Sequence, residues 1–203
     1  TDKVRGDLAL EFIKAATQAG YQVVLVDGKS AKTFRREIQT FENIRVINRR
    51  VAKRSPSKRL GMKVASKLPD VEVIILTEPE KTSLLKFISE ITEPIFKKEA
   101  DIVIPKREEK LFKSSYPRYM YESEMEGIKV YNEALFAHGL LIPEMKYFDS
   151  FFGPRVFRNE KKILSLFLGK YIFRTSKYKP ESNLFDPEEY SNVQFFPIVQ
   201  ALR

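Results

Sequence analysis

Polar side chains follow each of the most apolar runs in this chain. Four such groups occur, at 27–30, 49–58, 77–80 and 105–108. They follow the segments YQVVLV, IRVI, VEVIIL and ADIVI, which are typical of buried strands. In an open parallel sheet, ligands bind beyond the carboxyl ends of the strands. These four groups are therefore the first candidates for a functional site.

Glu78 and Glu80 are spaced two residues apart with Pro79 between them. In an extended segment, this spacing turns both carboxylates to the same side. Carboxylate oxygens are the ligands that Mg²⁺ and Mn²⁺ prefer, often shared with substrate phosphates. The pair predicts a divalent-cation site, with Mn²⁺ or Mg²⁺ as the cofactor. The alternative is an exposed loop whose acids favour the dipole of the next helix.

Lys58 and Arg59 follow Ser55 and Pro56, which are predicted to be the cap and first position of a helix. Free backbone N–H groups and the helix dipole favour an anion there, whereas cations oppose the dipole. A bound diphosphate would interact favourably with the helix N-terminus and would also neutralise the two cations. The alternatives are a solvated basic face or a nucleic-acid patch, and the absence of aromatic residues from 44–69 disfavours single-strand binding.

Asp27, Gly28 and Ser30 form a second candidate for nucleotide binding. The Asp27 carboxylate could accept hydrogen bonds from a nucleobase or ribose, Gly28 permits a tight turn and Ser30 could cap the following helix. The alternative is that these residues only make a turn. His138, beside Gly139, is predicted to be a helix C-cap and not a catalyst.

Charge and composition narrow the function classes. The formal net charge is +9, yet nine basic residues and no acid lie within 44–69, and basic and acidic residues balance elsewhere. A local basic segment favours a phosphate or nucleic-acid site over a generally cationic surface. The chain has no cysteine, no phosphate-binding GxxxxGK[ST] loop and no GxGxxG turn. No apolar run suits a membrane span, so a soluble, cytoplasmic protein is expected.

Helical and extended segments alternate along the first half, which is typical of a parallel sheet covered on both faces. Expected helices span 6–19, 31–41, 55–68 and 82–98, and expected strands span 21–28, 44–47, 71–80 and 100–108. The second half is rich in aromatic residues and is expected to shape a pocket at one end of the sheet. We expect a single domain over 1–203, with a nucleotide-binding half at 1–110 and an acceptor-side half at 111–203.

Over about residues 8–170, this order of motifs resembles the GT-A fold glycosyltransferases, in particular the large family with an Asp-Gly-x-Ser turn after the second strand. The resemblance rests on Asp27-Gly28-Lys29-Ser30, on the basic helix SKRLGMKVASKL, on LTEPEK where an Asp-x-Asp metal motif would stand, and on FGPRVF at 152–157. It implies a three-layer α/β/α Rossmann-like fold with a mainly parallel central sheet. The family's first strand would precede Thr1.

The resemblance also implies roles for residues. Asp27 would recognise the nucleoside, Lys58 or Arg59 the diphosphate, and Glu78 and Glu80 the metal. Donor binding is further assigned to Gly28, Ser30 and Arg155, and the candidates for the catalytic base are Asp186, Glu189 and Asp149. A carboxylate would deprotonate the acceptor hydroxyl while cations stabilise the departing nucleoside diphosphate.

The expected function is sugar transfer from a UDP- or GDP-sugar donor to an unknown carbohydrate or other hydroxyl acceptor. Three alternatives remain open. Nucleotidyl transfer onto a sugar phosphate uses a similar sheet but usually opens with a glycine-rich loop. A nucleic-acid-binding module would use the basic segment 44–69, and a degenerate transferase would bind nucleotide sugars without catalysis.

Overall fold

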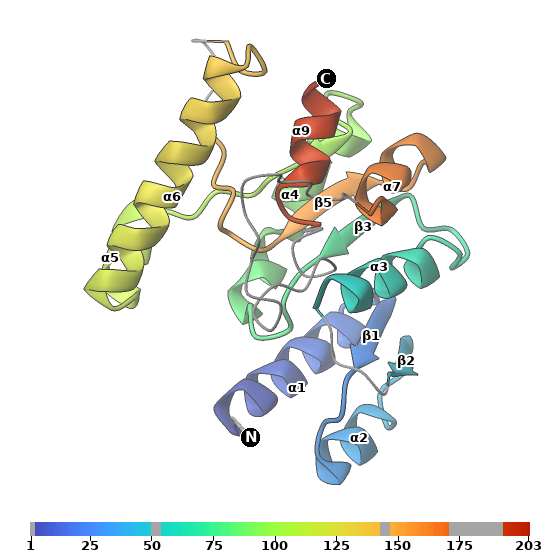
Figure 1. Cartoon of the computed structure of the whole chain (residues 1–203). Helices are drawn as coiled ribbons and strands as arrows, with labels where there is room; N and C mark the ends of the chain where they lie inside the picture. Colours follow the sequence, from blue (N-terminus) through green and yellow to red (C-terminus); the bar gives the residue numbers. More distant parts are fainter. Residues whose placement is uncertain (1–2, 50–53, 143–146, 171–192) are drawn as a thin grey trace, which may run out of the picture.

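The computed structural model describes residues 3–49, 54–142, 147–170 and 193–203, which form a mixed α/β structure (Figure 1). The helices are α1 (Lys3–Gln18), α2 (Lys32–Ile38), α3 (Arg54–Ala65), the 3-10 helix η1 (Thr82–Phe87), α4 (Ile88–Phe96), α5 (Glu109–Ser115), α6 (Arg118–Ala137), α7 (Lys161–Leu168) and α9 (Phe196–Leu202). The strands are β1 (Val23–Asp27), β2 (Ile44–Asn48), β3 (Val73–Leu76), β4 (Ile102–Val103) and β5 (Arg155–Arg158). In these ranges, no helix has the length and apolar character needed to cross a membrane.

The described strands form two sheets. β1 and β2 pair in parallel, whereas β5 lies between β3 and β4 and is antiparallel to both. The four expected strands are present, but the described residues do not join them into one large parallel sheet. No described strand pairs β1 with β3, and the second sheet is antiparallel because of β5, a short buried strand that the sequence pattern left unassigned.

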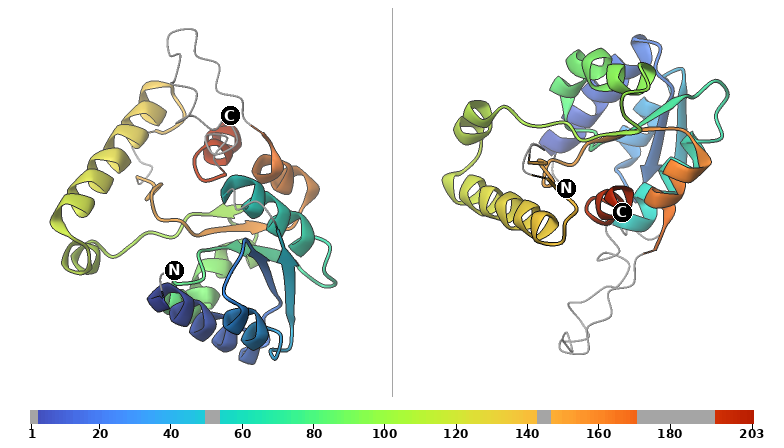
Figure 2. Two further views of the ribbon diagram at one scale, coloured as in Figure 1. Left: turned by 60° about the horizontal axis from the view of Figure 1, so that its bottom comes forward. Right: turned by 90° about the horizontal axis from the view of Figure 1, so that it is seen from above.

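Helices cover the strands on two sides (Figure 2). α1, η1 and α4 lie on one side, where α1 contacts β1 and α2, and α4 contacts β4 and β5. α3 and α7 lie on the other side, against β1, β3 and β5. α5 and α6 form a hairpin of helices that stands beside this layered part (Figures 1 and 2).

The apolar core has two clusters. The first joins α3 and α7 to β3 and β5, and its buried members are Met62, Ile74, Phe157, Ile163, Phe167 and Val193. The second lies under α1, and its buried members are Phe12, Ile13, Ile38 and Leu84. Residues of β1 and β2 pack against the second cluster, and so does Ile75 of β3, so the two clusters meet at β3.

Local sequence signals place some helix ends correctly and others not. His138 is the C-cap of α6 and Gly139 has φ +67°, as predicted. α3 begins at Arg54, before the predicted start, so Pro56 lies in the first turn and Lys58 is the fifth helical residue. Proline is tolerated in a first turn because its missing N–H has no partner there.

Candidate functional site

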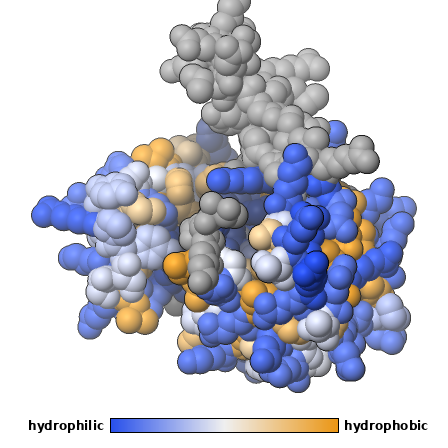
Figure 3. All heavy atoms as spheres, turned by 90° about the horizontal axis from the view of Figure 1, so that it is seen from below, coloured by the Kyte–Doolittle hydropathy of each residue, from blue (hydrophilic) through white to orange (hydrophobic). Residues whose placement is uncertain are grey.

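One cavity of about 1710 Å³ lies between β1 and β3, and its lining extends from their amino ends to the residues that follow their carboxyl ends. Its apolar lining comes from the two strands and from α1 and α3. Its polar lining includes Asp27, Ser30, Lys58, Glu78 and Glu80, all of which are sequence-predicted site residues. The structure therefore brings predicted nucleoside, diphosphate and metal residues to one cavity. Figure 3 shows one face of the molecule, on which hydrophilic side chains predominate and hydrophobic ones are interspersed.

Asp27 ends β1 and is 5% exposed. Its Oδ1 accepts hydrogen bonds from the backbone N–H (2.9 Å) and hydroxyl (2.6 Å) of Ser30, and from the N–H of Lys29 at 3.3 Å. Oδ2 lies 3.5 Å from Nε of Arg35. Burial raises the pKa of Asp27, but these hydrogen bonds and Arg35 outweigh burial, so the pKa lies below its ordinary value. Asp27 thus holds the turn at the cavity edge as a buried anion.

Ser30 does not cap α2, contrary to the prediction. The N-cap is Ala31, which makes no side-chain hydrogen bond, and the Ser30 hydroxyl donates to Asp27 instead. The Ser30 carbonyl accepts two hydrogen bonds from the Arg35 guanidinium. Gly28 lies in the same turn and also lines the cavity.

Lys58 of α3 and Glu78 after β3 form an ion pair at 3.3 Å, with about a quarter of each side chain exposed. The second oxygen of Glu78, Oε2, is buried and has no hydrogen-bond partner among the described residues. Gly153 lies directly against this carboxylate, and a Cβ atom at 153 would overlap it. The segment predicted to lie on the acceptor side therefore touches the predicted metal carboxylate.

Glu80 pairs with Arg5 of α1. Glu78 and Glu80 therefore engage different cations, on α3 and on α1. No group of three or more acidic or histidine side chains suited to a metal occurs in the described part of the chain. The arrangement does not fit a shared two-carboxylate site as it stands, because a divalent ion would have to displace Lys58 and Arg5. The metal site stays a prediction.

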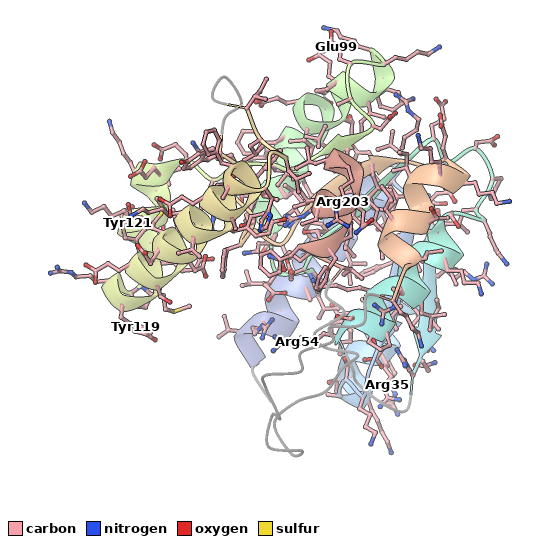
Figure 4. The ribbon with its side chains drawn as sticks, turned by 45° about the horizontal axis from the view of Figure 1, so that its top comes forward. Arg35, Arg54, Glu99, Tyr119, Tyr121 and Arg203 are labelled. Atoms are coloured by element: carbon pink, nitrogen blue, oxygen red, sulfur yellow. The ribbon has the colours of Figure 1, made fainter. Side chains whose placement is uncertain are left out.

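The basic segment divides into inward and outward side chains. Nη1 of Arg49 lies 3.4 Å from Oγ of Ser57, and Arg59 is only 7% exposed. An outward set is exposed, namely Arg45, Arg54, Lys63 and Lys67. Figure 4 shows Arg54 and Arg35 toward the same end of the molecule. The segment is thus not a uniformly solvated basic face.

Asp149, a candidate base, is 6% exposed and is bound by Arg107. Nε and Nη2 of Arg107 each donate to it at 2.8 Å, and Nη1 donates to Glu124 at 2.6 Å. Burial raises the pKa of Asp149, but the hydrogen bonds from Arg107 outweigh it and the pKa is lowered. A carboxylate with a lowered pKa and occupied oxygens is a poor proton acceptor. Asp186 and Glu189 lie outside the described residues.

Arg155, which was assigned to the donor site, is fully buried and does not line the cavity that the other predicted donor residues share. Its guanidinium donates to the backbone carbonyls of Ser150, Phe152, Pro154 and Gln194. Burial lowers the pKa of Arg155 to about 10. A side chain whose donors all serve the backbone has none left for a nucleotide, so Arg155 ties together the chain around β5.

Sequence reasoning missed the roles of Arg107 and Arg5, and it did not predict the contact of Gly153 with Glu78. Arg107 stood in a strand-end group already singled out, but nothing in the pattern pairs it with Asp149, which is 42 residues away. Arg5 reaches the cavity through the packing of α1, and Gly153 reaches the Glu78 carboxylate through the turn before β5. Comparisons with protein-family models, with curated proteins and with solved structures found no match to this chain.

Proposed function

We propose that this chain binds a nucleoside-diphosphate sugar in the cavity at the ends of β1 and β3 and transfers the sugar to a hydroxyl acceptor, as a glycosyltransferase of the GT-A fold type. The convergence of Asp27, Lys58 and Glu78 on one cavity supports it most directly. The helices on two sides of the strands agree with the proposal, as does the position of Asp27 and Glu78 at the carboxyl ends of β1 and β3.

The diphosphate would lie beside Lys58 and the first turn of α3. Lys58 faces the cavity, and its partner Glu78 retains a buried oxygen without a hydrogen bond among the described residues. A bound diphosphate would replace Glu78 as the anionic partner of Lys58. The nucleoside would lie at the turn of Asp27, where the backbone around Gly28 approaches the cavity.

In the transfer step, the acceptor oxygen forms a bond to the anomeric carbon as the bond from that carbon to the diphosphate oxygen breaks. The acceptor proton passes to a carboxylate, and the leaving diphosphate carries away the bonding electrons. Lys58 stabilises the negative charge of the leaving diphosphate. Asp186 and Glu189 stay the predicted bases, since Asp149 is engaged by Arg107.

A divalent cation at Glu78 and Glu80 stays a separate prediction, because Lys58 and Arg5 occupy these carboxylates in the structure. The metal dependence of donor binding tests this element separately from the nucleotide site.

The first experiment is a thermal-shift screen against UDP, GDP, CDP, dTDP and their sugars, each with and without Mn²⁺. A ligand at 100 times its Kd stabilises the native state by about 2.7 kcal/mol, which corresponds to about 5 to 11 °C in Tm for a chain of this size. We expect one nucleotide to give such a shift. The absence of a shift with every nucleotide would contradict the proposal.

A pair of variants on α3 locates the binding site. Lys58→Gln should weaken nucleotide binding about tenfold or more, because it removes a charged contact to the diphosphate. Lys63→Gln is the matched control, since Lys63 lies on the same helix but is exposed. Equal nucleotide affinities in the two variants would show that the diphosphate does not bind at Lys58.

A second candidate is a domain that binds the nucleotide sugar without transferring it. The observation that favours it is the engagement of both predicted metal carboxylates by basic side chains. Donor binding without sugar release, to acceptor or to water, would support this alternative. Salt-sensitive binding to RNA or DNA without a nucleotide shift would instead assign the basic segment to nucleic acid.

A further inference from the structure

A second cavity lies between α6 and α9. Its volume is about 290 Å³, close to the lower limit of about 300 Å³ for pockets that bind small molecules. None of the residues that line it lines the larger cavity between β1 and β3. The second cavity is therefore a separate space, and the proposed nucleotide site does not account for it.

Tyr131 joins the two helices at one end of this second cavity. Its hydroxyl donates to the carbonyl of Phe195, the residue before α9, at 3.0 Å, and the two ring centroids lie 5.4 Å apart. From there α6 continues to its C-cap His138, and α9 continues to its C-cap Arg203. At a rise of 1.5 Å per helical residue, the lining extends about 10 Å along α6, from Tyr131 to His138.

The walls between these two ends are apolar. Leu135 is 4% exposed, and Ala134, Leu140 and Val199 complete the aliphatic lining. Water gains little from contact with such walls, whereas an apolar ligand is removed from water by entering. At the roughly 30 Å³ that one water molecule occupies in the liquid, the space holds on the order of ten non-hydrogen atoms of a ligand.

Basic side chains lie at the other end of the second cavity. His138 and Arg203 are both exposed and line it, and Arg203 is at the end of α9 (Figure 4). No acidic residue lines this cavity, and Glu133 of α6 lies 4.0 Å from Lys129. Arg203 has no ion pair within the described part of the chain. A guanidinium in this position is ready to bind a carboxylate or phosphate.

The backbone at the end of α6 does not compete for this guanidinium. The last carbonyls of the helix accept hydrogen bonds from the N–H groups of the turn that follows it, which includes Gly139 with φ +67°. His138 adds an imidazole that can donate a hydrogen bond. The second cavity thus combines an apolar interior with donors for an anion at one end.

We propose that the second cavity binds a small amphipathic anion. An apolar chain of about eight to ten carbon atoms lies between α6 and α9, and its carboxylate or phosphate head group lies beside Arg203. Burial of the chain supplies most of the affinity, and the head group fixes the orientation. A free acid and a membrane lipid share this chemistry, and the experiments below distinguish them.

The first test uses octanoate, below the concentration at which it forms micelles, and 1-octanol as its uncharged analogue. Both are added to the protein while amide shifts are followed by NMR. Octanoate should shift the amides of 131–140 and 196–203 and should leave those of β1 and β2 unchanged. The absence of shifts in both helices would overturn the inference.

Variants of α6 locate the apolar chain. Ala134→Phe places a large side chain in the second cavity and should weaken octanoate binding at least about tenfold, since lost burial of two methylene groups alone has this effect. Ala137→Phe is the matched control, because Ala137 is exposed on the same helix and does not line the cavity. Thermal unfolding shows that both variants stay folded. Equal affinities in the two variants would contradict binding between α6 and α9.

A variant of α9 tests the head group. Arg203→Gln should weaken octanoate binding about three- to fivefold, which is the range of an exposed ion pair, and should leave octanol binding unchanged. Equal losses for the two ligands, or no loss for octanoate, would show that Arg203 does not bind the anion and would overturn the assignment of the ligand class.

Sedimentation with vesicles identifies the source of the anion. The vesicles contain phosphatidylcholine with or without phosphatidylglycerol. If the wild type sediments with the anionic vesicles and Ala134→Phe does not, the ligand is a membrane lipid. If the two proteins sediment alike, or neither sediments, the ligand is a free anion. The nucleotide shifts described above are measured separately, so failure of this inference and failure of the proposed function are distinguishable.

Discussion

At the residue scale, buried charges in this protein are matched mainly by backbone and side-chain N–H groups. Asp27 accepts from Ser30 and Lys29, and Asp149 accepts from Arg107 and the N–H of Phe152. Because burial opposes ionisation, these hydrogen bonds must outweigh it for the pKa of each acid to be lowered. These hydrogen bonds therefore keep both carboxylates ionised.

Asp149→Asn should destabilise the protein in a pH-dependent way. Its lowered pKa means that its contribution to stability is present above the unfolded value of about 3.8 and is lost as the pH falls through the folded value. At pH 7, the loss should be about 3 kcal/mol, because Arg107 would lose its main partner in a buried site. Urea unfolding at pH 7 and pH 3 measures the difference.

The difference between wild type and Asp149→Asn should narrow at pH 3. Glu122→Gln is the control, because its ion pair with Arg118 is exposed and should contribute little at either pH. A destabilisation by Asp149→Asn that is the same at both pH values would show that the charge of Asp149 is not its source.

The candidate site was predictable from strand ends but not from side-chain pairs. Asp27, Lys58, Glu78 and Glu80 lie at the cavity because the carboxyl ends of strands meet, which is a topological rule. The partners of these residues depend on tertiary packing, as the Lys58–Glu78 pair shows. The engagement of Arg155 by four carbonyls could not be read from the sequence, because carbonyl positions depend on the turn before β5.

At the element scale, the sequence predicted where helices and strands lie along the chain better than it predicted which strands pair with one another. Gly20 ends α1 with φ +83°, and Gly139 follows the C-cap of α6, as expected of glycine beyond a helix. The predicted helix over 82–98 is divided into η1 and α4. The two parts differ in their backbone hydrogen bonds, which are of the 3-10 type in η1 and of the α type in α4.

Gly6→Ala should stabilise the protein by about 0.5 to 1 kcal/mol. Gly6 lies inside α1, and a Cβ atom there would meet nothing within 4 Å, so alanine removes backbone entropy from the unfolded chain without strain. Gly20→Ala is the matched control. Its site is equally open, but its positive φ disfavours alanine, so this variant should be destabilised. Stabilisation of both variants in thermal unfolding would contradict this explanation.

At the scale of the whole molecule, one apolar cluster packs mainly under β1 and β2 and the other mainly around β3 and β5, and β3 contributes to both. Ile38 is fully buried under α1, and Phe167 is fully buried against β5, where it stacks on Phe157 at 4.1 Å between ring centroids. The cavity separates the edges of the two sheets. Loss of packing in one cluster is therefore expected to loosen one sheet more than the other.

Ile38→Ala in the 203-residue chain should cost about 2 to 5 kcal/mol and should speed amide exchange in β1 and β2 more than in β5. Phe167→Ala should have the reverse distribution, with a cost of about 3 to 5 kcal/mol. Native-state hydrogen exchange measures both. Equal acceleration in the two sheets by either variant would show that they unfold as one unit.

The binding of Arg155 to carbonyls has a consequence for mutational tolerance. Every residue type carries a backbone carbonyl, so the positions that accept from Arg155 can change their side chains without loss of these bonds. Lysine cannot replace Arg155, because one ammonium does not reproduce the planar set of guanidinium donors. In a saturation mutagenesis screen for folded protein, position 155 should therefore accept almost no substitution, whereas position 152 should accept many.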